Sequence, residues 1–123
     1  MNEERVFTPE EADAELDGLR RRLPRIRDAR RGLIDASERI KEAVAAESGG
    51  VAGSAWFEHQ QTLKAELEWL SSRGILLRDP ETGLVDFPGE VGGRRVFLCW
   101  RLDEPNVAYY HEEHAGFSGR RPL

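Results

Sequence analysis

The sequence predicts an α+β fold in which a kinked N-terminal helical hairpin packs on a small antiparallel sheet of three to four strands. Two observations predict it: apolar residues recur at steps of three, four or seven before position 72, and after Gly74 they alternate with polar residues. A chain of 123 residues is one domain's worth of protein. We expect a single domain over 1–123, with the helical hairpin at 8–72, the sheet at 75–112 and a C-terminal tail at 113–123.

A capping signal predicts where the first helix begins. Thr8 can cap the free backbone amides, Pro9 suits the first helical position, and Glu11 can complete a capping box. The apolar stripe that follows has the spacing of one face of a helix and ends before Gly49. Its inward-facing positions are Ala12, Leu16, Leu19, Leu23, Ile26, Leu33, Ile40 and Val44.

Pro24 interrupts this helix. A proline inside a helix removes one hydrogen bond and clashes with the preceding turn, so we expect a kink or a break near Arg22 or Leu23. One straight helix over 9–47 would also span about 58 Å, whereas a globule of this size has a radius of gyration of about 14 Å. The helix must bend, break or pair with another chain, and we expect a homodimer.

A second helix is predicted after a connection rich in glycine and serine at 48–54. The helix covers 55–72, and Gly74 is placed to end it in a left-handed conformation. Two helices joined by a short loop usually pack antiparallel. The apolar face of the second helix holds Trp56, Leu63, Leu67 and Leu70.

After Gly74 the spacing of the apolar residues changes from that of a helix to that of a strand. Two short apolar runs, 75–77 and 84–87, flank a turn with a proline and a late glycine, which predicts a hairpin. The run 94–102 is apolar on both faces, so we expect it to be the central strand, covered on both sides. A last strand is predicted over 107–112. One face of the central strand holds Val96, Leu98, Trp100 and Leu102, and the other holds Phe97 and Cys99.

Composition argues against several classes of protein. No apolar run approaches the roughly 20 residues that cross a bilayer, and residues 1–5 lack the character of a secretory leader. We therefore expect a cytoplasmic protein with no membrane partner. The single cysteine, Cys99, excludes an intramolecular disulfide and a zinc site with two or more thiolates from one chain. The net charge of -5 argues against a general nucleic-acid binder.

Residues 20–31 hold seven arginines and one acid, a density that could bind phosphates. Many of these arginines share the helix face away from the apolar stripe with acids, at spacings that allow ion pairs such as Asp35 with Arg39. A solvated, charge-paired face is the simpler interpretation. Arg30 differs because it falls within the apolar stripe, where it can extend to solvent or act as a ligand-binding residue that reaches a carboxylate inside the structure.

Four segments, taken in order, carry a family resemblance: 7–12 (FTPEEA), 83–88 (GLVDFP), 96–102 (VFLCWRL) and 111–120 (HEEHAGFSGR). Together they resemble the domain-of-unknown-function family 2203, along the chain from Phe7 to Pro122. The resemblance implies an α+β fold. It supplies no chemistry, so the candidate site residues are judged by their own properties.

A C-terminal cluster of aromatic, imidazole and carboxylate side chains is the strongest site candidate. His111 and Glu112 are the expected acid–base or ligand groups, and Tyr109 is a candidate ligand-binding residue. The cofactor class we expect is a divalent metal ion, with His111, Glu113 and His114 as candidate ligands. On a regular strand Glu113 shares a side with His111 whereas His114 faces the other side, so a further donor must come from elsewhere. The available donors are Asp86, Cys99, His59 and Glu66.

Three further residues complete the candidate site. Asp86 interrupts an apolar strand and is the expected second catalytic carboxylate, compensated by Arg95, Arg101 or a backbone donor if it is buried. Cys99 is a candidate ligand-binding residue, although its apolar neighbours suppress the thiolate and favour an inert thiol. Arg120 follows a glycine-rich turn and could anchor an anion, or the tail could simply dock through Phe117.

Three functions stay open at this point. The first is binding of a small molecule or metal ion, with or without enzymatic activity, in a pocket between the sheet and the C-terminal tail. The second is a noncatalytic homo-oligomeric interaction module that acts through its helices. The third, nucleic-acid binding through the arginine-rich helix, is the least favoured.

Overall fold

The computed structural model describes residues 5–45 and 52–123. Residues 1–4, at the acidic start, and 46–51, which hold most of the predicted glycine- and serine-rich connection, lie outside the described residues. The rest of that connection, from Ala52, belongs to a helix.

Three α-helices precede the sheet within the described residues: α1 (Pro9–Asp13), α2 (Leu16–Ala45) and α3 (Ala52–Ser72). The capping box is confirmed, because the Thr8 hydroxyl accepts from the Glu11 N–H at 3.1 Å and Glu11 Oε1 accepts from the Thr8 N–H at 2.9 Å. The predicted stop after α3 is also confirmed, since Gly74 has a φ of 76°, which favours glycine.

Pro24 does not break the helix. We expected a kink or a break near Arg22 or Leu23, and the break does not occur, because α2 runs through Pro24 as one helix. Leu23 and Ile26, on either side of the proline, are each 1% exposed. Their burial in the core offsets the hydrogen bond that the proline removes.

The helical segment is instead interrupted at Ala14 and Glu15, between α1 and α2. The Glu15 N–H donates to the Ala12 carbonyl at 3.0 Å, which is the tighter bonding pattern of a 3-10 turn. The Glu15 side chain is buried and accepts from Arg73 at 3.1 Å. This turn lets Ala12 and Leu16 both enter the core.

Across the described residues the strands form one five-stranded antiparallel sheet in the order β1-β2-β3-β4-β5. As predicted, the most apolar strand is central. The prediction of three to four strands is wrong, because the tail returns to pair with β4, and the Leu123 N–H donates to the Ala108 carbonyl at 2.8 Å. The strands are β1 (Leu76–Asp79), β2 (Leu84–Val91), β3 (Arg94–Arg101), β4 (Tyr109–His111) and β5 (Arg121–Pro122).

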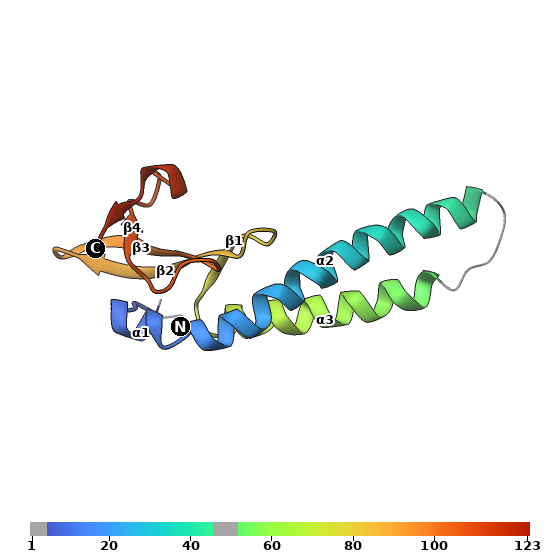
Figure 1. Cartoon of the computed structure of the whole chain (residues 1–123), viewed down its shortest axis with the longest axis horizontal. Coiled ribbons are helices and arrows are strands. Elements are labelled where there is room, and N and C mark those ends of the chain that lie inside the picture. The colour runs from blue at the N-terminus through green and yellow to red at the C-terminus, as the bar shows by residue number, and fades with distance from the viewer. Residues whose placement is uncertain (1–4, 46–51) are drawn as a thin grey trace.

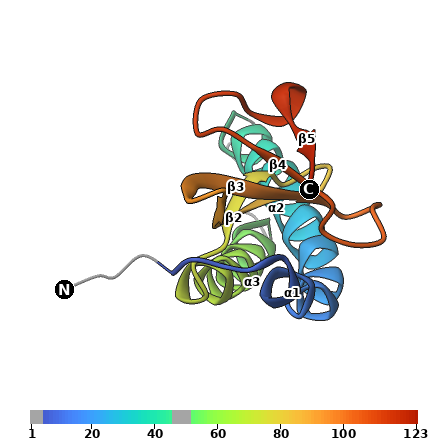
Figure 2. The ribbon, with the colours of Figure 1, turned by 90° about the vertical axis from the view of Figure 1, so that its left-hand side faces the viewer.

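The helices lie on one face of the sheet and the C-terminal segment lies on the other (Figure 2). Because side chains alternate along a strand, one face of β2 and β3 meets the helices. That face is apolar and forms the core with α1, the start of α2 and the end of α3. The core residues are Phe7, Ala12, Leu16, Leu19, Leu23, Ile26, Leu70, Ile75, Val85, Phe87, Val96, Leu98, Trp100 and Val107.

The helical hairpin covers the sheet only at its base, and the rest extends beyond the sheet (Figure 1). Ile26 is the last residue of α2 in the core. We call the part of α2 from Arg27 onward, with the part of α3 that packs along it, the helical arm. The 30 residues of α2 span about 45 Å. The long helical segment therefore fits this fold in two ways: it breaks at Glu15, and the helical arm extends beyond the sheet.

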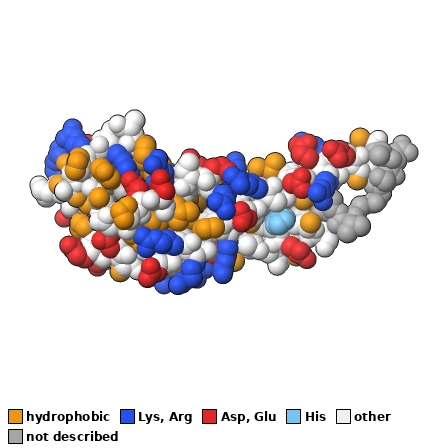
Figure 3. Space-filling view, viewed as in Figure 1, with side chains coloured by type: hydrophobic (Ala, Val, Ile, Leu, Met, Phe, Trp, Pro, Cys, Tyr) orange, Lys and Arg blue, Asp and Glu red, His pale blue; other side chains and the backbone are white. Residues whose placement is uncertain are grey.

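The outer surface of the helices is charged, with basic and acidic side chains interspersed (Figure 3). The predicted pair of Asp35 with Arg39 is confirmed at 3.2 Å. Arg22 and Arg25 both reach the Glu66 carboxylate, at 2.8 and 3.7 Å. Among the described helices, none combines the length and the apolar character that a bilayer crossing requires.

Candidate metal centre

Three buried polar residues lie side by side on the face of the sheet that meets the C-terminal segment. The register pairs Asp86 of β2 with Cys99 of β3, and Phe97 of β3 with His111 of β4. Residues that are directly opposite, or two apart on one strand, share a face, so Asp86, Cys99 and His111 project to the same side. Their donor atoms, a carboxylate oxygen, a thiol sulfur and an imidazole nitrogen, lie within 4.8 Å of one another.

His111 uses both of its ring nitrogens. Nδ1 lies 2.7 Å from the Glu112 carbonyl oxygen, and because a carbonyl can only accept, Nδ1 carries a hydrogen. Nε2 lies 3.0 Å from each carboxylate oxygen of Asp86. In a neutral imidazole with its hydrogen on Nδ1, Nε2 presents a lone pair to those oxygens. The contact between Nε2 and Asp86 therefore requires a proton or a metal cation.

Asp86 has a second partner, the Arg78 guanidinium on the edge strand β1. Arg78 Nε donates to Asp86 Oδ2 at 2.9 Å, and the Arg78 guanidinium lies 5.0 Å from the centre of the Phe97 ring. Only 2% of Asp86 is exposed. A carboxylate buried to that degree needs such partners, because desolvation disfavours its charge.

Cys99 is held as a thiol at neutral pH. Burial raises its pKa to about 11, and the charge of Asp86 adds to the rise, while Arg120, 3.8 Å from Sγ, opposes it. A thiol with that pKa is a poor nucleophile. Since both nitrogens of His111 are engaged elsewhere, His111 is not placed to take the thiol proton. The arrangement does not fit a cysteine–histidine nucleophile.

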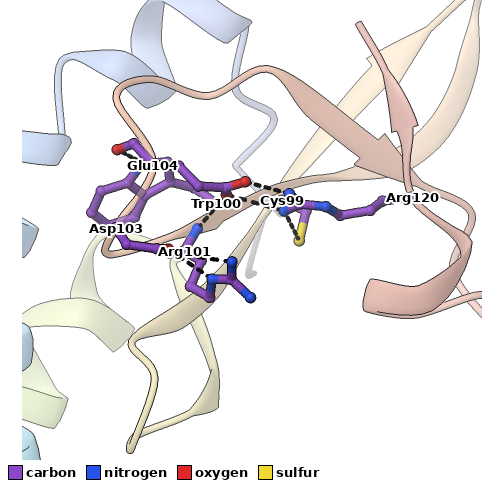
Figure 4. Close-up of polar contacts among 6 residues, drawn as sticks. All are labelled: Cys99, Trp100, Arg101, Asp103, Glu104 and Arg120. Carbon is purple, nitrogen blue, oxygen red and sulfur yellow. Dashed lines mark hydrogen bonds and ion pairs between the residues drawn. The ribbon is translucent and has the colours of Figure 1, made fainter.

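Arg120 fastens the C-terminal segment to the sheet beside the thiol (Figure 4). Its guanidinium pairs with the Glu104 carboxylate, and this bond raises the pKa of Arg120. The guanidinium also lies 4.1 Å from the centre of the Tyr109 ring and 4.3 Å from that of Phe117. The charge of Arg120 is thus matched within the chain.

A cavity of about 250 Å³ opens onto the three buried residues. We call it the cluster cavity. Because a water molecule occupies about 30 Å³ of liquid, the cavity has room for several waters or one small molecule. Its wall is formed by Asp86, Cys99 and His111 together with Arg78, Leu84, Glu113, Gly116 and Phe117.

The structure brings together only part of the site that the sequence predicts. Asp86, Cys99, His111 and Glu113 line the same cavity. Glu112 does not line it: its carboxylate pairs with Arg94 at 2.8 Å, and only its backbone carbonyl reaches the cluster.

The other predicted residues lie away from the cavity wall. His114 is exposed and is not brought to His111, because β4 ends at His111 and the chain turns there. Arg30 pairs with Glu81 at 3.2 Å, next to the turn between β1 and β2. Tyr109 packs under the guanidinium of Arg120.

A family model described as "Uncharacterized conserved protein (DUF2203)" matches residues 5–123. The chain belongs to the DUF2203 family. The match confirms the resemblance carried by the four sequence segments. No curated protein and no solved structure is significantly similar to the chain. The function of this DUF2203 protein is therefore inferred from the geometry of the cluster.

Two residues of the site, Arg78 and Glu104, were not predicted from the sequence. Arg78 lies where the pairing of β1 with β2 shifts register, between Leu77 and Asp79, so regular strand alternation could not have placed its side chain beside Asp86. Glu104 lies in the turn after β3, where its Oε1 accepts from the Arg101 N–H at 2.8 Å. Its pairing with Arg120 depends on the path of the tail, which no local pattern encodes.

Proposed function

We propose that this DUF2203 protein binds a divalent transition metal, zinc by preference, through Asp86, Cys99 and His111, and holds a small molecule at the metal's open position. The observation that carries the proposal is the contact of His111 Nε2 with the Asp86 carboxylate. Nε2 lies 3.0 Å from both carboxylate oxygens, a contact that needs a shared cation, and a divalent metal ion can take that place as a proton can.

The donor set favours zinc. A thiolate, an imidazole and a carboxylate are all ligands of Zn²⁺, which is softer than Mg²⁺ or Ca²⁺. Two atoms 3.0 Å apart, each about 2.1 Å from a metal, subtend roughly 90° at it, an angle that neighbouring ligands can adopt. The Cys99 sulfur lies within 4.8 Å of the other two donor atoms, so its side chain would move toward them to bind the same ion. Metal binding would displace the thiol proton of Cys99.

The neighbours of the three residues match the partners that metal ligands need. Metal-bound histidines commonly donate their other ring N–H to a carbonyl, and the Glu112 carbonyl fills that position for His111. Ligating carboxylates are themselves hydrogen-bonded, as Asp86 is by Arg78. These contacts would orient the ligands before the metal arrives.

Three protein ligands beside a cavity are typical of a reactive rather than a purely structural zinc site. Structural zinc sites are closed by four protein ligands, whereas catalytic sites keep one position for water or substrate. A bound zinc would supply Lewis acidity in the cluster cavity, and it would lower the pKa of a water that it binds. This is the enzymatic form of the proposal.

The test is a titration of the metal-free protein with zinc, in competition with a chromophoric chelator. We expect one zinc per chain. His111→Gln should weaken binding by more than about 100-fold, because loss of even an outer partner of a ligand costs about 10- to 100-fold. The matched control is His114→Gln, which removes an exposed imidazole three positions away and should leave the affinity unchanged.

Loss of folding could imitate loss of the site, so a second variant is needed. Cys99→Ser keeps the size of the side chain and should weaken zinc binding while the circular dichroism spectrum stays that of the unmodified protein. The proposal fails if the unmodified protein binds no zinc, or if folded Cys99→Ser and His111→Gln both bind it as tightly as the unmodified protein.

A separate observation favours a second function, self-association through the helices. A groove of about 410 Å³ runs along α3, and its exposed wall is largely apolar. Lys64 and Glu68 stand on this wall one turn apart. In an antiparallel pairing of two copies of α3, Lys64 of one copy would face Glu68 of the other. The groove is lined by Gln60, Leu63, Lys64, Leu67, Glu68 and Ser71.

We infer that two copies of the chain pair through this groove. Light scattering after size exclusion should give a dimer, and Leu67→Asp should shift it toward the monomer. The matched control is Gln61→Asp, an exposed position on the same helix that does not line the groove. A monomer at every concentration would contradict the inference and would leave the metal proposal untouched.

A further inference from the structure

Arg78 has N–H donors that the cluster of Asp86, Cys99 and His111 does not use. Its Nε donates to Asp86, and its guanidinium packs on the Phe97 ring. Within the part of the chain that the structure describes, its two terminal nitrogens have no hydrogen-bond partner, and the side chain lines the cluster cavity. Two adjacent N–H groups on a planar guanidinium match the two oxygens of a carboxylate.

The charge of the loaded site would also favour an anion. The two charges of the metal would be matched by Asp86 and by the thiolate of Cys99. Because Asp86 then shares its charge with the metal, the guanidinium of Arg78 is left without a full counter-charge. The Arg78 side chain is 44% exposed, so an anion that enters the cavity from solvent can reach it.

The rest of the wall restricts the shape of such an anion. Leu84 and Phe117 present apolar surface, which accommodates a short carbon chain. Glu113 brings a carboxylate to the same cavity, and it would repel a bare anion but accept from a hydroxyl or amino group. The volume of about 250 Å³ limits the ligand to a small molecule.

We propose that the cluster cavity takes a small carboxylate with a neighbouring hydroxyl or amino group. The carboxylate binds Arg78, one of its oxygens or the neighbouring group completes the coordination of the metal, and the donor hydrogen reaches Glu113. This inference rests on the proposed metal site, because the metal provides the third attachment point.

The test uses zinc-loaded protein at saturating zinc and three probes, namely lactate, its uncharged analogue lactamide, and inorganic phosphate, each titrated by calorimetry. Lactate should bind, and lactamide should bind at least about tenfold more weakly, since it lacks the charge that pairs with Arg78. Arg78→Gln should weaken lactate binding by at least about tenfold. The matched control is Arg94→Gln, which removes an exposed arginine that does not line the cavity.

Zinc affinity is measured first for every variant, because Arg78 also bonds Asp86. Protein that binds zinc but not lactate, or that binds lactamide as well as lactate, would overturn the inference and leave the metal site standing. Tighter binding of phosphate would overturn the assignment to carboxylates. Unchanged lactate binding in Arg78→Gln would overturn the role of Arg78. If zinc does not bind in the first step, the proposed function and this inference fail together.

Discussion

The two faces of the sheet are built from the same strands and have opposite chemistry. The face toward the helices is apolar, with Phe87 and Trp100 fully buried in the core. The face toward the C-terminal segment holds Asp86 and His111, which are 2% and 3% exposed. Burial is nearly equal on the two faces, so burial alone does not explain the difference.

The difference between the two faces distinguishes residues that stabilise the fold from residues that serve a function. Apolar burial stabilises a fold directly, whereas a buried ionic pair often contributes little, since desolvation opposes the attraction. A chain selected only for stability could also have an apolar face toward the C-terminal segment. The polar cluster is therefore the part of the sheet that requires a functional explanation.

The largest effect is expected on the helix face. Phe87→Ala would remove a ring that packs edge-on against Phe7, with ring centres 5.1 Å apart, and should lower the free energy of unfolding by about 3 to 5 kcal/mol. The matched control on the tail face is Phe117→Ala, a ring that is 38% exposed and should cost about 1 kcal/mol or less. Urea denaturation measures both, and equal losses would remove the contrast between the faces.

A smaller loss is expected from breaking the polar cluster in the metal-free protein. Asp86→Ala would leave His111 buried without its partner and should cost about 3 kcal/mol. Replacing both partners, as Asp86→Leu with His111→Leu, should recover most of that loss, because Arg78 is partly exposed and can turn to solvent. If the double variant is the least stable, the cluster is a structural element after all.

The smallest effect is expected at the ion pair between Glu104 and Arg120. Burial alone would raise the pKa of Glu104, but bonds from Arg120 and from the Arg101 N–H outweigh it, so the pKa is lower in the folded chain than in the unfolded one. The stabilisation is therefore present above about pH 4.5 and is lost as the pH falls through the folded value. Glu104→Gln should cost about 1 to 2 kcal/mol at pH 7.

The pH dependence of the unfolding free energy tests this ion pair. The difference in unfolding free energy between the unmodified protein and Glu104→Gln should shrink on acidification below about pH 4.5. A difference that is constant from neutral to acidic pH would show that Glu104 acts through shape and not through charge.

Local patterns predicted most of the fold. The capping box at Thr8, the stop at Gly74 and the central position of β3 all follow from rules that act over a few residues. The break at Glu15 did not follow, because it depends on the contact of Glu15 with Arg73, 58 residues away. β5 is two residues long and contains Pro122, so it carries no strand pattern.

The candidate site was only partly predictable for the same reason. Alternation placed Cys99 on the face opposite the core, and the sequence marked Asp86 and His111 as unusual. It did not show that these residues meet, because that depends on the register of three strands. A shift of one residue in β4 would have turned His111 to the helix face.

The most direct measurement is zinc-edge X-ray absorption spectroscopy of the zinc-loaded protein. Our account predicts one sulfur at about 2.3 Å with nitrogen and oxygen ligands at about 2.0 to 2.2 Å, and loss of the sulfur shell in Cys99→Ser. A shell of nitrogen and oxygen alone in the unmodified protein would contradict a centre formed by Asp86, Cys99 and His111.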